Sequence, residues 1–381
     1  MPAPKICHLT SVHSATDPRI FYKECRSLAR AGFAVAVVGA HPCDAVIDEV
    51  QIKSIEKDSR RLFRMTRTVY HVLTEALKQN ADIYHFHDPE LIPVGLLLKA
   101  RGKEVIYDIH EDLPKDILSK PYLPRWSRAA ISSLMNELES GACRKFSALV
   151  VVTPSIAERF RAINDRTVVI HNYPYVRELM EGTTSAPLWI QRRQAVAYVG
   201  GITMQRALRE MVAAMAILPI SLPATLELAG PEIISEADSN QVRADSGWKR
   251  VRHHGFIDQP STFHILQNVR AGLVLFHPEP NHLEAMPQKI FEYMGAGLPV
   301  IASDFPLWKR IIGSSGCGIF VNPMKPAEIA GAIEYVLTHP DEAEEMGKRG
   351  QAAVMESFNW DSESTKLVNL YRELSEKLCA A

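Results

Sequence analysis

Two glutamates late in the chain, Glu284 and Glu292, have the spacing to hold two ends of one ligand. Pro287 lies between them and suits the first turn of a helix, which Gly295 and Gly297 would end. Eight helical residues rise about 12 Å, whereas the nucleophile and acid of a retaining glycosidase lie only about 5 Å apart. The spacing therefore excludes that pair and favours an elongated ligand.

The start of this helix suits an anion bound between the two carboxylates. Free N–H groups lie at a helix N-terminus, and the cation Lys289 stands in the first turn. These groups favour a diphosphate, with a sugar at Glu284 and a ribose at Glu292. Such a ligand is a nucleotide-sugar. The alternative for Glu292 is an ordinary residue on an exposed helix surface.

Length and composition limit the class of protein. The 381 residues predict two domains with sizeable cores, and 43 basic against 44 acidic side chains give no field that would suggest nucleic acid. The six cysteines form no Cys-x-x-Cys pair, so we expect reduced thiols in a cytoplasmic protein, without a disulfide or metal framework. A strand is expected close to the N-terminus, which leaves no room for a signal peptide, and apolar runs are too short to span a membrane.

Strand-like and helix-like segments alternate along the chain, as in parallel α/β sheets. The strands expected in the first half are Lys5–Thr10, Ala34–Gly39, Ile83–His87, Glu104–Ile109, Ala148–Thr153 and Val168–His171. Those expected in the second half are Ala195–Val199, Ala224–Ala229, Val251–His254, Gly272–Phe276, Pro299–Ala302 and Gly318–Val321. Helical patterns between strands include Phe21–Arg30 and Arg125–Arg144. A turn-rich hinge near residues 171–187 predicts domains over 1–173 and 174–360, followed by a helix over 361–381.

Four further segments carry the same family resemblance as the two-glutamate run. They are His8–Glu24, His85–Glu90, Tyr107–Asp112 and Tyr198–Ile202. With Glu-x7-Glu, Pro-x-Lys-x-x-Glu and Gly-x-Pro-Val, the chain resembles the retaining glycosyltransferases of family 4, of the type that builds bacterial surface polysaccharides. The resemblance implies the GT-B fold. In that fold two Rossmann-like parallel-sheet domains face a deep cleft, and the C-terminal helix crosses back to the first domain.

Polar residues stand where several strands end, and ligands of open α/β sheets bind beyond these carboxyl ends. His110 follows a strand, and the resemblance implies that it is the active-site histidine, which contacts the donor sugar near its reacting carbon. His87 and Asp88 leave another strand and are candidates for the acceptor side. His85 lies deeper and is expected to be structural. A satisfied structural histidine is the alternative at each of these positions.

The segment Asp17-Pro-Arg19 follows the first strand, where this fold has a loop that faces the cleft. Arg19 is a candidate for holding a phosphate of the donor or of the acceptor, because a guanidinium binds phosphate through two parallel hydrogen bonds. Asp17 precedes a proline and is expected to cap the following helix.

The turn Val199–Arg206 joins a strand to a helix, and Gly200 and Gly201 would let its backbone approach a ligand closely. Members of the family usually carry an Arg and then a Lys-Gly pair here, and the two cations clamp the diphosphate. This chain has Gly201 in place of that Arg and Arg206 in place of the Lys. One cation is therefore missing, and Arg206 with Lys289 would supply the two charges. The alternative for Arg206 is an exposed residue in a first helical turn.

The resemblance implies five further donor-binding residues, Gly230, Phe256, Ile257, Met286 and Pro287. Phe256 and Ile257 belong to a turn that resembles the base-binding turn of the family, where main-chain groups contact the base edge and an apolar side chain covers its face. A plain transition from strand to loop is the alternative.

Two basic segments could contact an acceptor or a membrane. One helical face carries Arg60, Phe63, Arg64, Arg67 and His71, opposite an apolar stripe of Leu62, Met65, Val69, Leu73 and Ala76. A second segment, residues 120–128, combines basic residues with Tyr122 and Trp126. Both would suit an anionic leaflet or a lipid-diphosphate acceptor. A solvated basic face is the alternative.

The sequence thus predicts a retaining, metal-independent glycosyltransferase of the hexosyltransferase type, which transfers a sugar from a nucleotide-sugar to a glycan hydroxyl. A UDP- or GDP-sugar is the expected co-substrate, without a cofactor or metal, since no Asp-x-Asp motif occurs. The resemblance implies a lipid-linked acceptor at the inner face of the cytoplasmic membrane. Two alternatives stay open: a nucleotide-sugar isomerase or phosphorylase of the same fold, and a catalytically silent binding subunit, which the missing cation at Gly201 would favour.

Overall fold

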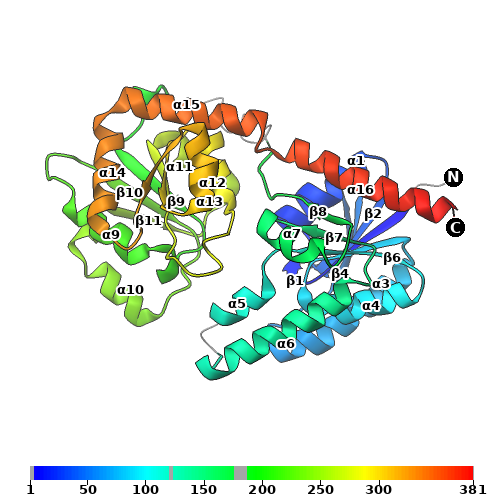
Figure 1. The fold of residues 1–381 in the computed structure, drawn as a ribbon. Coiled ribbons are helices and arrows are strands. Elements are labelled where there is room, and N and C mark those ends of the chain that lie inside the picture. The colour runs from blue at the N-terminus through cyan, green and yellow to red at the C-terminus, as the bar shows by residue number, and fades with distance from the viewer. Residues whose placement is uncertain (1–3, 120–122, 176–186, 381) are drawn as a thin grey trace. The chain divides into compact units, whose positions relative to one another are not determined.

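The computed structural model describes residues 4–119, 123–175 and 187–380, which form two compact units (Figure 1). The first unit contains Met1–Asn172 and Trp360–Ala381, and the second contains Tyr173–Asn359. The expected hinge falls partly on residues 176–186, which lie outside the described residues.

The first unit is built on an eight-stranded sheet with the order β3-β4-β2-β1-β5-β6-β7-β8. Its strands are β1 Lys5–Ser14, β2 Ala34–Ala40, β3 Ala45–Ile47, β4 Val50–Ile55, β5 Ile83–Phe86, β6 Glu104–Ile109, β7 Ala148–Val151 and β8 Thr167–Val169. Neighbouring strands are parallel except in the β3–β4 hairpin, which the sequence did not predict. Its turn is Asp48-Glu49, with positive φ angles of 47° and 65°, and it lacks the glycine that usually marks such a turn.

Helices cover both faces of this sheet. They are η1 Pro18–Cys25, α1 Arg26–Arg30, α2 Arg61–Phe63, η2 Arg64–Thr68, α3 Val69–Gln79, η3 Pro89–Leu91, α4 Ile92–Ala100, α5 Leu113–Ser119, α6 Arg125–Cys143, α7 Pro154–Arg161 and α16 Trp360–Ala380. The expected helix over 21–30 is the continuous pair η1 and α1. The side chain of Asp17 caps it by accepting hydrogen bonds from the N–H groups of Arg19 (2.8 Å) and Ile20 (3.1 Å), so the expected capping role is confirmed.

The central strands β1 and β5 separate an apolar layer from a polar one. Cys7, Leu9, Tyr84 and Phe86 belong to the apolar core. On the opposite face His8 and His85 are partners in the strand register, and both are fully buried. The period of two along a strand therefore places histidines from two neighbouring strands side by side.

Helix α16 closes the polar side of this unit (Figure 1). Its first residue, Trp360, is fully buried and donates its indole N–H to Ser27 Oγ of α1 (2.9 Å). One turn further on, the Glu363 carboxylate accepts a hydrogen bond from the backbone N–H of His171 (2.9 Å). These contacts explain why the last helix belongs to the first unit.

The second unit contains a six-stranded, entirely parallel sheet with the order β11-β10-β9-β12-β13-β14. Its strands are β9 Ala195–Val199, β10 Thr225–Ala229, β11 Val251–Gly255, β12 Ala271–Val274, β13 Val300–Ser303 and β14 Gly318–Val321. All six expected strands are present. The predicted fold class, with two Rossmann-like parallel-sheet domains, is confirmed.

The helices of the second unit pack on both faces of its sheet. They are η4 Trp189–Gln191, η5 Met204–Arg206, α9 Leu208–Ile217, α10 Glu236–Arg243, η6 Ser246–Arg250, α11 Gln259–Asn268, α12 Gln288–Gly295, α13 Pro306–Trp308, η7 Lys309–Gly313, α14 Pro326–Thr338 and α15 Pro340–Glu356. Helix α12 packs especially close to the sheet, because a Cβ at Gly272 would lie 2.1 Å from the ring of Tyr293. The Tyr293 hydroxyl also accepts the N–H of Val199 (2.8 Å), so α12 is anchored to the end of β9.

Candidate active site

The expected donor helix is α12, which begins at Gln288 after the N-cap residue Pro287 (φ −66°, ψ 131°). Pro287 was expected inside the first turn, but its extended ψ still belongs to the preceding loop. Glu284 lies in that loop with an exposed side chain. Glu292 is half-buried within the helix, where Gln288 Nε2 donates to its Oε1 (2.7 Å).

The most unusual charge in the second unit is the ammonium of Lys289. Its side chain is only 8 % exposed, and Nζ has no hydrogen-bond partner among the described residues. Nζ lies 3.8 Å from the ring centroid of Tyr198 and 5.8 Å from that of Phe276. Burial, together with the charge of Arg206, lowers the pKa of Lys289 well below its usual range.

The guanidinium of Arg206 lies against Gly201. Its Nη1 donates to the carbonyl of Gly201 (2.9 Å), and a Cβ at Gly201 would lie 2.8 Å from the same nitrogen. A Cβ at Gly200 would lie 3.0 Å from Lys289 Nζ. Both cations therefore lie directly against this glycine turn, and a side chain at Gly201 would collide with the guanidinium.

A second glycine brings two strand ends together beside this turn. Gly230, which follows β10, has φ 135°, and a Cβ there would lie 2.1 Å from the carbonyl oxygen of Gly200. Its N–H donates to the carbonyl of Gly255 (2.7 Å). Only glycine fits this approach, so Gly230 shapes the turn through its backbone.

The two residues of the expected base-binding turn, Phe256 and Ile257, differ in their surroundings. Phe256 is 81 % exposed, whereas Ile257 is half-buried and lines an open pocket of about 580 Å³. Other residues of this pocket are Glu227, His254, Pro260, His264 and Ile265. Of the two candidates, only Ile257 contributes to the wall. Met286, the remaining donor candidate, packs half-buried against the core of the unit.

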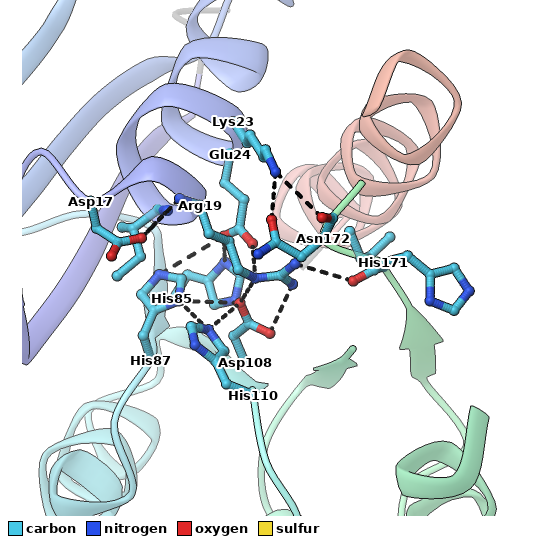
Figure 2. Close-up of polar contacts among 12 residues, drawn as sticks. Asp17, Arg19, Lys23, Glu24, His85, His87, Asp108, His110, His171 and Asn172 are labelled. Carbon is cyan, nitrogen blue, oxygen red and sulfur yellow. Dashed lines mark hydrogen bonds and ion pairs between the residues drawn. The ribbon is translucent and has the colours of Figure 1, made fainter. Parts of the chain in front are cut away.

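In the first unit, Asp108 of β6 is the centre of a buried polar network (Figure 2). The Arg19 guanidinium donates to both of its oxygens, from Nε (3.0 Å) and Nη2 (3.1 Å), and to the carbonyl of Ile170 from Nη1 (3.2 Å). Burial alone would raise the pKa of Asp108, but Arg19 and His110 hold it well below its usual range. Asp108 is therefore a buried carboxylate that orients its donors.

The phosphate role expected for Arg19 does not agree with this geometry. Arg19 is 4 % exposed, and its guanidinium is already committed to Asp108 and Ile170. Residue type and strand-end position suggested a ligand contact, but the partner carboxylate, 89 residues away in the chain, could not be recognised from the sequence.

His110 follows β6 and keeps 22 % of its side chain exposed. Its Nε2 lies 2.9 Å from Asp108 Oδ2 and 3.4 Å from His87 Nδ1. With Nε2–H donated to the carboxylate, Nδ1 is left as the nitrogen that can accept a hydrogen bond. The residue thus has a fixed orientation and one accessible edge.

His87 and Asp88 are both 2 % exposed, which contradicts their expected position on the acceptor side. Asp88 Oδ2 accepts hydrogen bonds from Thr10 Oγ1 (2.8 Å) and from the N–H groups of Ser11 (2.7 Å) and Val12 (3.1 Å). Asp88 therefore fixes the second half of β1, while His87 contacts Asp108 through Nδ1.

His13 is a candidate that the sequence reasoning missed. Its ring lies 5.7 Å from that of His110, and its Nδ1 lies 3.3 Å from Asp17 Oδ2. The hydrogen bond to Asp17 raises the pKa of His13. The sequence could have indicated His13 by its position in the family-like segment His8–Glu24, between the expected strand Lys5–Thr10 and Asp17.

The basic helical face is more apolar at its surface than expected. Leu62 and Met65 of the expected apolar stripe are 78 % and 46 % exposed, and Phe63 of the basic face is 48 % exposed. Arg64 pairs with Glu90 (3.1 Å). In the second basic segment Trp126 is 85 % exposed, while residues 120–122 lie outside the described residues. None of the described helices has the length and apolar character to cross a membrane.

Two families match successive parts of the chain, and the second match extends past Asn359 into the C-terminal helix of the first unit. Residues 19–173 match Glycosyltransferase Family 4, and residues 204–369 match a family described as glycosyl transferase-like. A glycogen synthase of Mycobacterium tuberculosis is 23 % identical over 257 residues, which are 65 % of this chain and 59 % of that relative. The chain thus spans about three-fifths of the length of that relative.

Solved structures share the fold over almost the whole chain. Sucrose-phosphate synthase from Thermosynechococcus elongatus has a TM-score of 0.76 and 18 % identity, covering 98 % of this chain and 100 % of its own. Anabaena HepE, solved in complex with UDP-glucose, has a TM-score of 0.68 and 15 % identity, covering 99 % and 100 %. These likenesses show that the chain has the fold of GT-B glycosyltransferases, and successive parts of it are similar to Glycosyltransferase Family 4 and to a glycosyl transferase-like family.

Proposed function

We propose that this protein is a glycosyltransferase that binds a nucleotide-sugar in its second unit and transfers the sugar to a hydroxyl of a glycan. The observation that carries the proposal is Lys289, a buried ammonium without a hydrogen-bond acceptor at the start of α12. An unpaired buried charge is costly, so a fold that keeps one at a strand exit is suited to an anionic ligand. The UDP-glucose bound by HepE, a structure of the same fold, supports a nucleotide-sugar.

The diphosphate would lie between the Gly200–Gly201 turn and α12. Lys289, Arg206 and the first N–H groups of α12 supply positive charge or donors there. This charge stabilises the departing nucleotide without a metal ion, by groups that are oriented before the reaction begins. The silent-subunit alternative was favoured by the missing cation at Gly201, and the guanidinium of Arg206 beside Gly201 argues against it.

The two glutamates would bind the two ends of the donor. Glu292, half-buried and held by Gln288, accepts from the ribose hydroxyls, and the exposed Glu284 accepts from the sugar hydroxyls. Retention of the anomeric configuration is inferred from the resemblance of this segment. In that course the leaving phosphate takes the proton of the acceptor on the same face of the sugar.

His110 would act on the sugar. Asp108 holds its ring through Nε2, so Nδ1 can accept a hydrogen bond from a sugar hydroxyl. Its orientation is set in advance, which favours the transition state at no cost of reorganisation.

The acceptor is proposed to be a lipid-linked polysaccharide intermediate at the inner face of the cytoplasmic membrane. The exposed surface that we call the apolar–basic patch carries Arg60, Leu62, Phe63, Met65, Arg67 and Tyr70. Apolar side chains between arginines are suited to the interface of an anionic leaflet.

Replacing Lys289 tests the proposed diphosphate site. Lys289→Met should weaken UDP or GDP affinity by about tenfold or more, as expected for one charge-assisted hydrogen bond. Its melting temperature should stay equal or rise, because the depressed pKa shows that burial disfavours the charged form below the usual pKa of lysine. Calorimetry and thermal denaturation measure both. Lys348→Met, at an exposed residue of α15, is the matched control. As a separate test of metal independence, the affinity of the unchanged protein for UDP should be the same in EDTA as in Mg²⁺. Unchanged affinity in the Lys289 variant would refute the site.

Replacing the glutamates separates the two ends of the donor. Glu292→Ala should weaken binding of UDP or GDP itself, because it removes the ribose contacts. Glu284→Ala should leave that affinity nearly unchanged but impair turnover of the nucleotide-sugar. Titration calorimetry with the nucleotide diphosphate, beside a turnover assay, distinguishes the two. Equal losses of nucleotide affinity would show that the assignment of the two ends is wrong.

Replacing His110 tests its role in transfer. His110→Ala should lower kcat by about 10²-fold, the loss expected for one positioned polar group. UDP affinity and melting temperature should change little, since the ring is partly exposed. His339→Ala, an exposed histidine at the end of α14, serves as the control. A badly destabilised variant, or one with normal turnover, would return His110 to a structural role.

The apolar–basic patch can be tested without knowledge of the acceptor. Arg60→Ala combined with Arg67→Ala should reduce co-sedimentation with anionic vesicles, and binding by the unchanged protein should weaken as salt shortens the Debye length. The control variant, Arg209→Ala with Arg243→Ala, loses the same charge from the second unit. If both double variants sediment like the unchanged protein, the patch is only solvated.

A further inference from the structure

Four buried side chains on the polar face of the first sheet converge on one place. His8 of β1 and His85 of β5 are register partners, and His87 follows two residues after His85, on the same face. Glu24 reaches this place from η1. All four side chains are fully buried, and one ligand atom from each lies within 4.8 Å of the others.

The distances suit a four-coordinate metal ion. His8 Nδ1 lies 3.0 Å from His87 Nε2, and Glu24 Oε2 lies 3.8, 3.8 and 3.9 Å from His8 Nδ1, His85 Nδ1 and His87 Nε2. Zn²⁺ binds histidine nitrogen at about 2.0–2.1 Å, so tetrahedral ligand atoms stand roughly 3.4 Å apart. The ring centroids are 4.7–5.2 Å apart, so the three imidazoles can surround one ion with little movement.

Each histidine is also held from outside the cluster. His8 Nε2 and His85 Nδ1 contact the Tyr371 hydroxyl of α16 at 3.2 and 2.8 Å, and His87 Nδ1 lies 3.2 Å from Asp108 Oδ2. Outer partners of this kind fix the tautomer and ring orientation of metal-binding histidines. His8 Nδ1 and His87 Nε2 are then left to bind an ion, and His85 offers Nδ1, which lies 3.8 Å from Glu24 Oε2, once it exchanges its contact with the Tyr371 hydroxyl for the ion.

Several atoms of the cluster have no hydrogen-bond partner among the described residues. They are His85 Nε2 and both carboxylate oxygens of Glu24. Arg19 Nε lies 3.0 Å from Glu24 Oε1, but its N–H is directed to Asp108. Buried polar atoms without partners are rare and call for a cause.

We propose that His8, Glu24, His85 and His87 form a binding site for a divalent first-row transition metal of the Zn²⁺ type. Three imidazoles and one carboxylate match the ligand preferences of this class. The ion would tie β1, β5 and η1 together and, through Tyr371, α16. Through His87 and Asp108 it would also change the strength of the hydrogen bond that orients His110. It is a structural ion of the first unit, separate from the metal-free diphosphate site proposed for the second.

A metal-free arrangement is the competing explanation. Burial raises the pKa of Glu24 well above its usual range, and the charge of Asp108 raises it further. Glu24 would then be a neutral acid beside Asp108. The two explanations differ in what replacing Glu24 by glutamine does. If Glu24 is a neutral acid, Glu24→Gln should change the stability of the protein little. If Glu24 is a metal ligand, the same substitution removes the anionic ligand and should weaken metal binding.

The first experiment uses the full chain, stripped with a strong chelator and then titrated with Co²⁺. We expect one equivalent to bind with the intense visible absorption of four-coordinate cobalt, and Zn²⁺ to displace it and raise the melting temperature. Weak absorption typical of six-coordinate cobalt, or no rise in melting temperature with Zn²⁺, would overturn the proposal even if no variant folds.

The second experiment compares variants. Glu24→Gln should weaken Co²⁺ binding at least about tenfold and abolish the effect of Zn²⁺ on the melting temperature. His339→Gln, on the exposed end of α14, should behave like the unchanged protein. If Glu24→Gln binds Co²⁺ as tightly as the unchanged protein, or melts higher while neither protein responds to metal, Glu24 is a neutral acid and the proposal is wrong.

Discussion

The ion pair between Arg19 and Asp108 is the interaction on which the first unit depends. Both side chains are at most 4 % exposed, and the guanidinium holds both carboxylate oxygens. Removing one partner of such a buried pair typically costs about 3–5 kcal/mol, because the other charge is left unpaired. The pair therefore keeps Asp108 ionised, and an ionised Asp108 is what orients His87 and His110. The position of a candidate catalytic histidine thus follows from a charge that never meets the substrate.

The second unit contains a buried charge, Lys289, whose surroundings differ from those of Arg19 in the first unit. Lys289 is 8 % exposed, and aromatic faces, the charge of Arg206 and the charge of Glu292 act on it, but its Nζ has no hydrogen-bond partner among the described residues. A cation over a ring gains about 0.5–2 kcal/mol, which is less than an ion pair provides in a buried site. The contrast separates a structural charge from one that is suited to a ligand. Arg19 is hydrogen-bonded to an anion of the protein, whereas Lys289 Nζ has no hydrogen-bond partner in the described part of the chain.

This contrast also explains which features could be predicted from the sequence. The strands, α12 and the capping by Asp17 follow from local patterns, since each depends on neighbouring residues. The ion pair of Arg19 could not be predicted, because its partner, Asp108, is distant in the chain. The β3–β4 hairpin lacks a typical turn sequence, and the exposure of Leu62 and Met65 could not be predicted because periodicity does not show where a helix leaves the core. His85 was expected to be structural, but its neighbours His8 and Tyr371 could be found only from the register of β1 with β5 and the return of α16.

Asp108 links the two polar centres of the first unit. One of its oxygens, Oδ2, lies 3.2 Å from His87 Nδ1 and 2.9 Å from His110 Nε2, while His87 Nε2 contacts His8. Both histidines therefore compete for the same oxygen. A cation bound at His87 Nε2 would make its Nδ1–H a stronger donor to Asp108 and so weaken the hold of Asp108 on His110. Whatever occupies the histidine cluster is therefore coupled to His110, both through the Asp108 carboxylate and through the 3.4 Å approach of His87 Nδ1 to His110 Nε2.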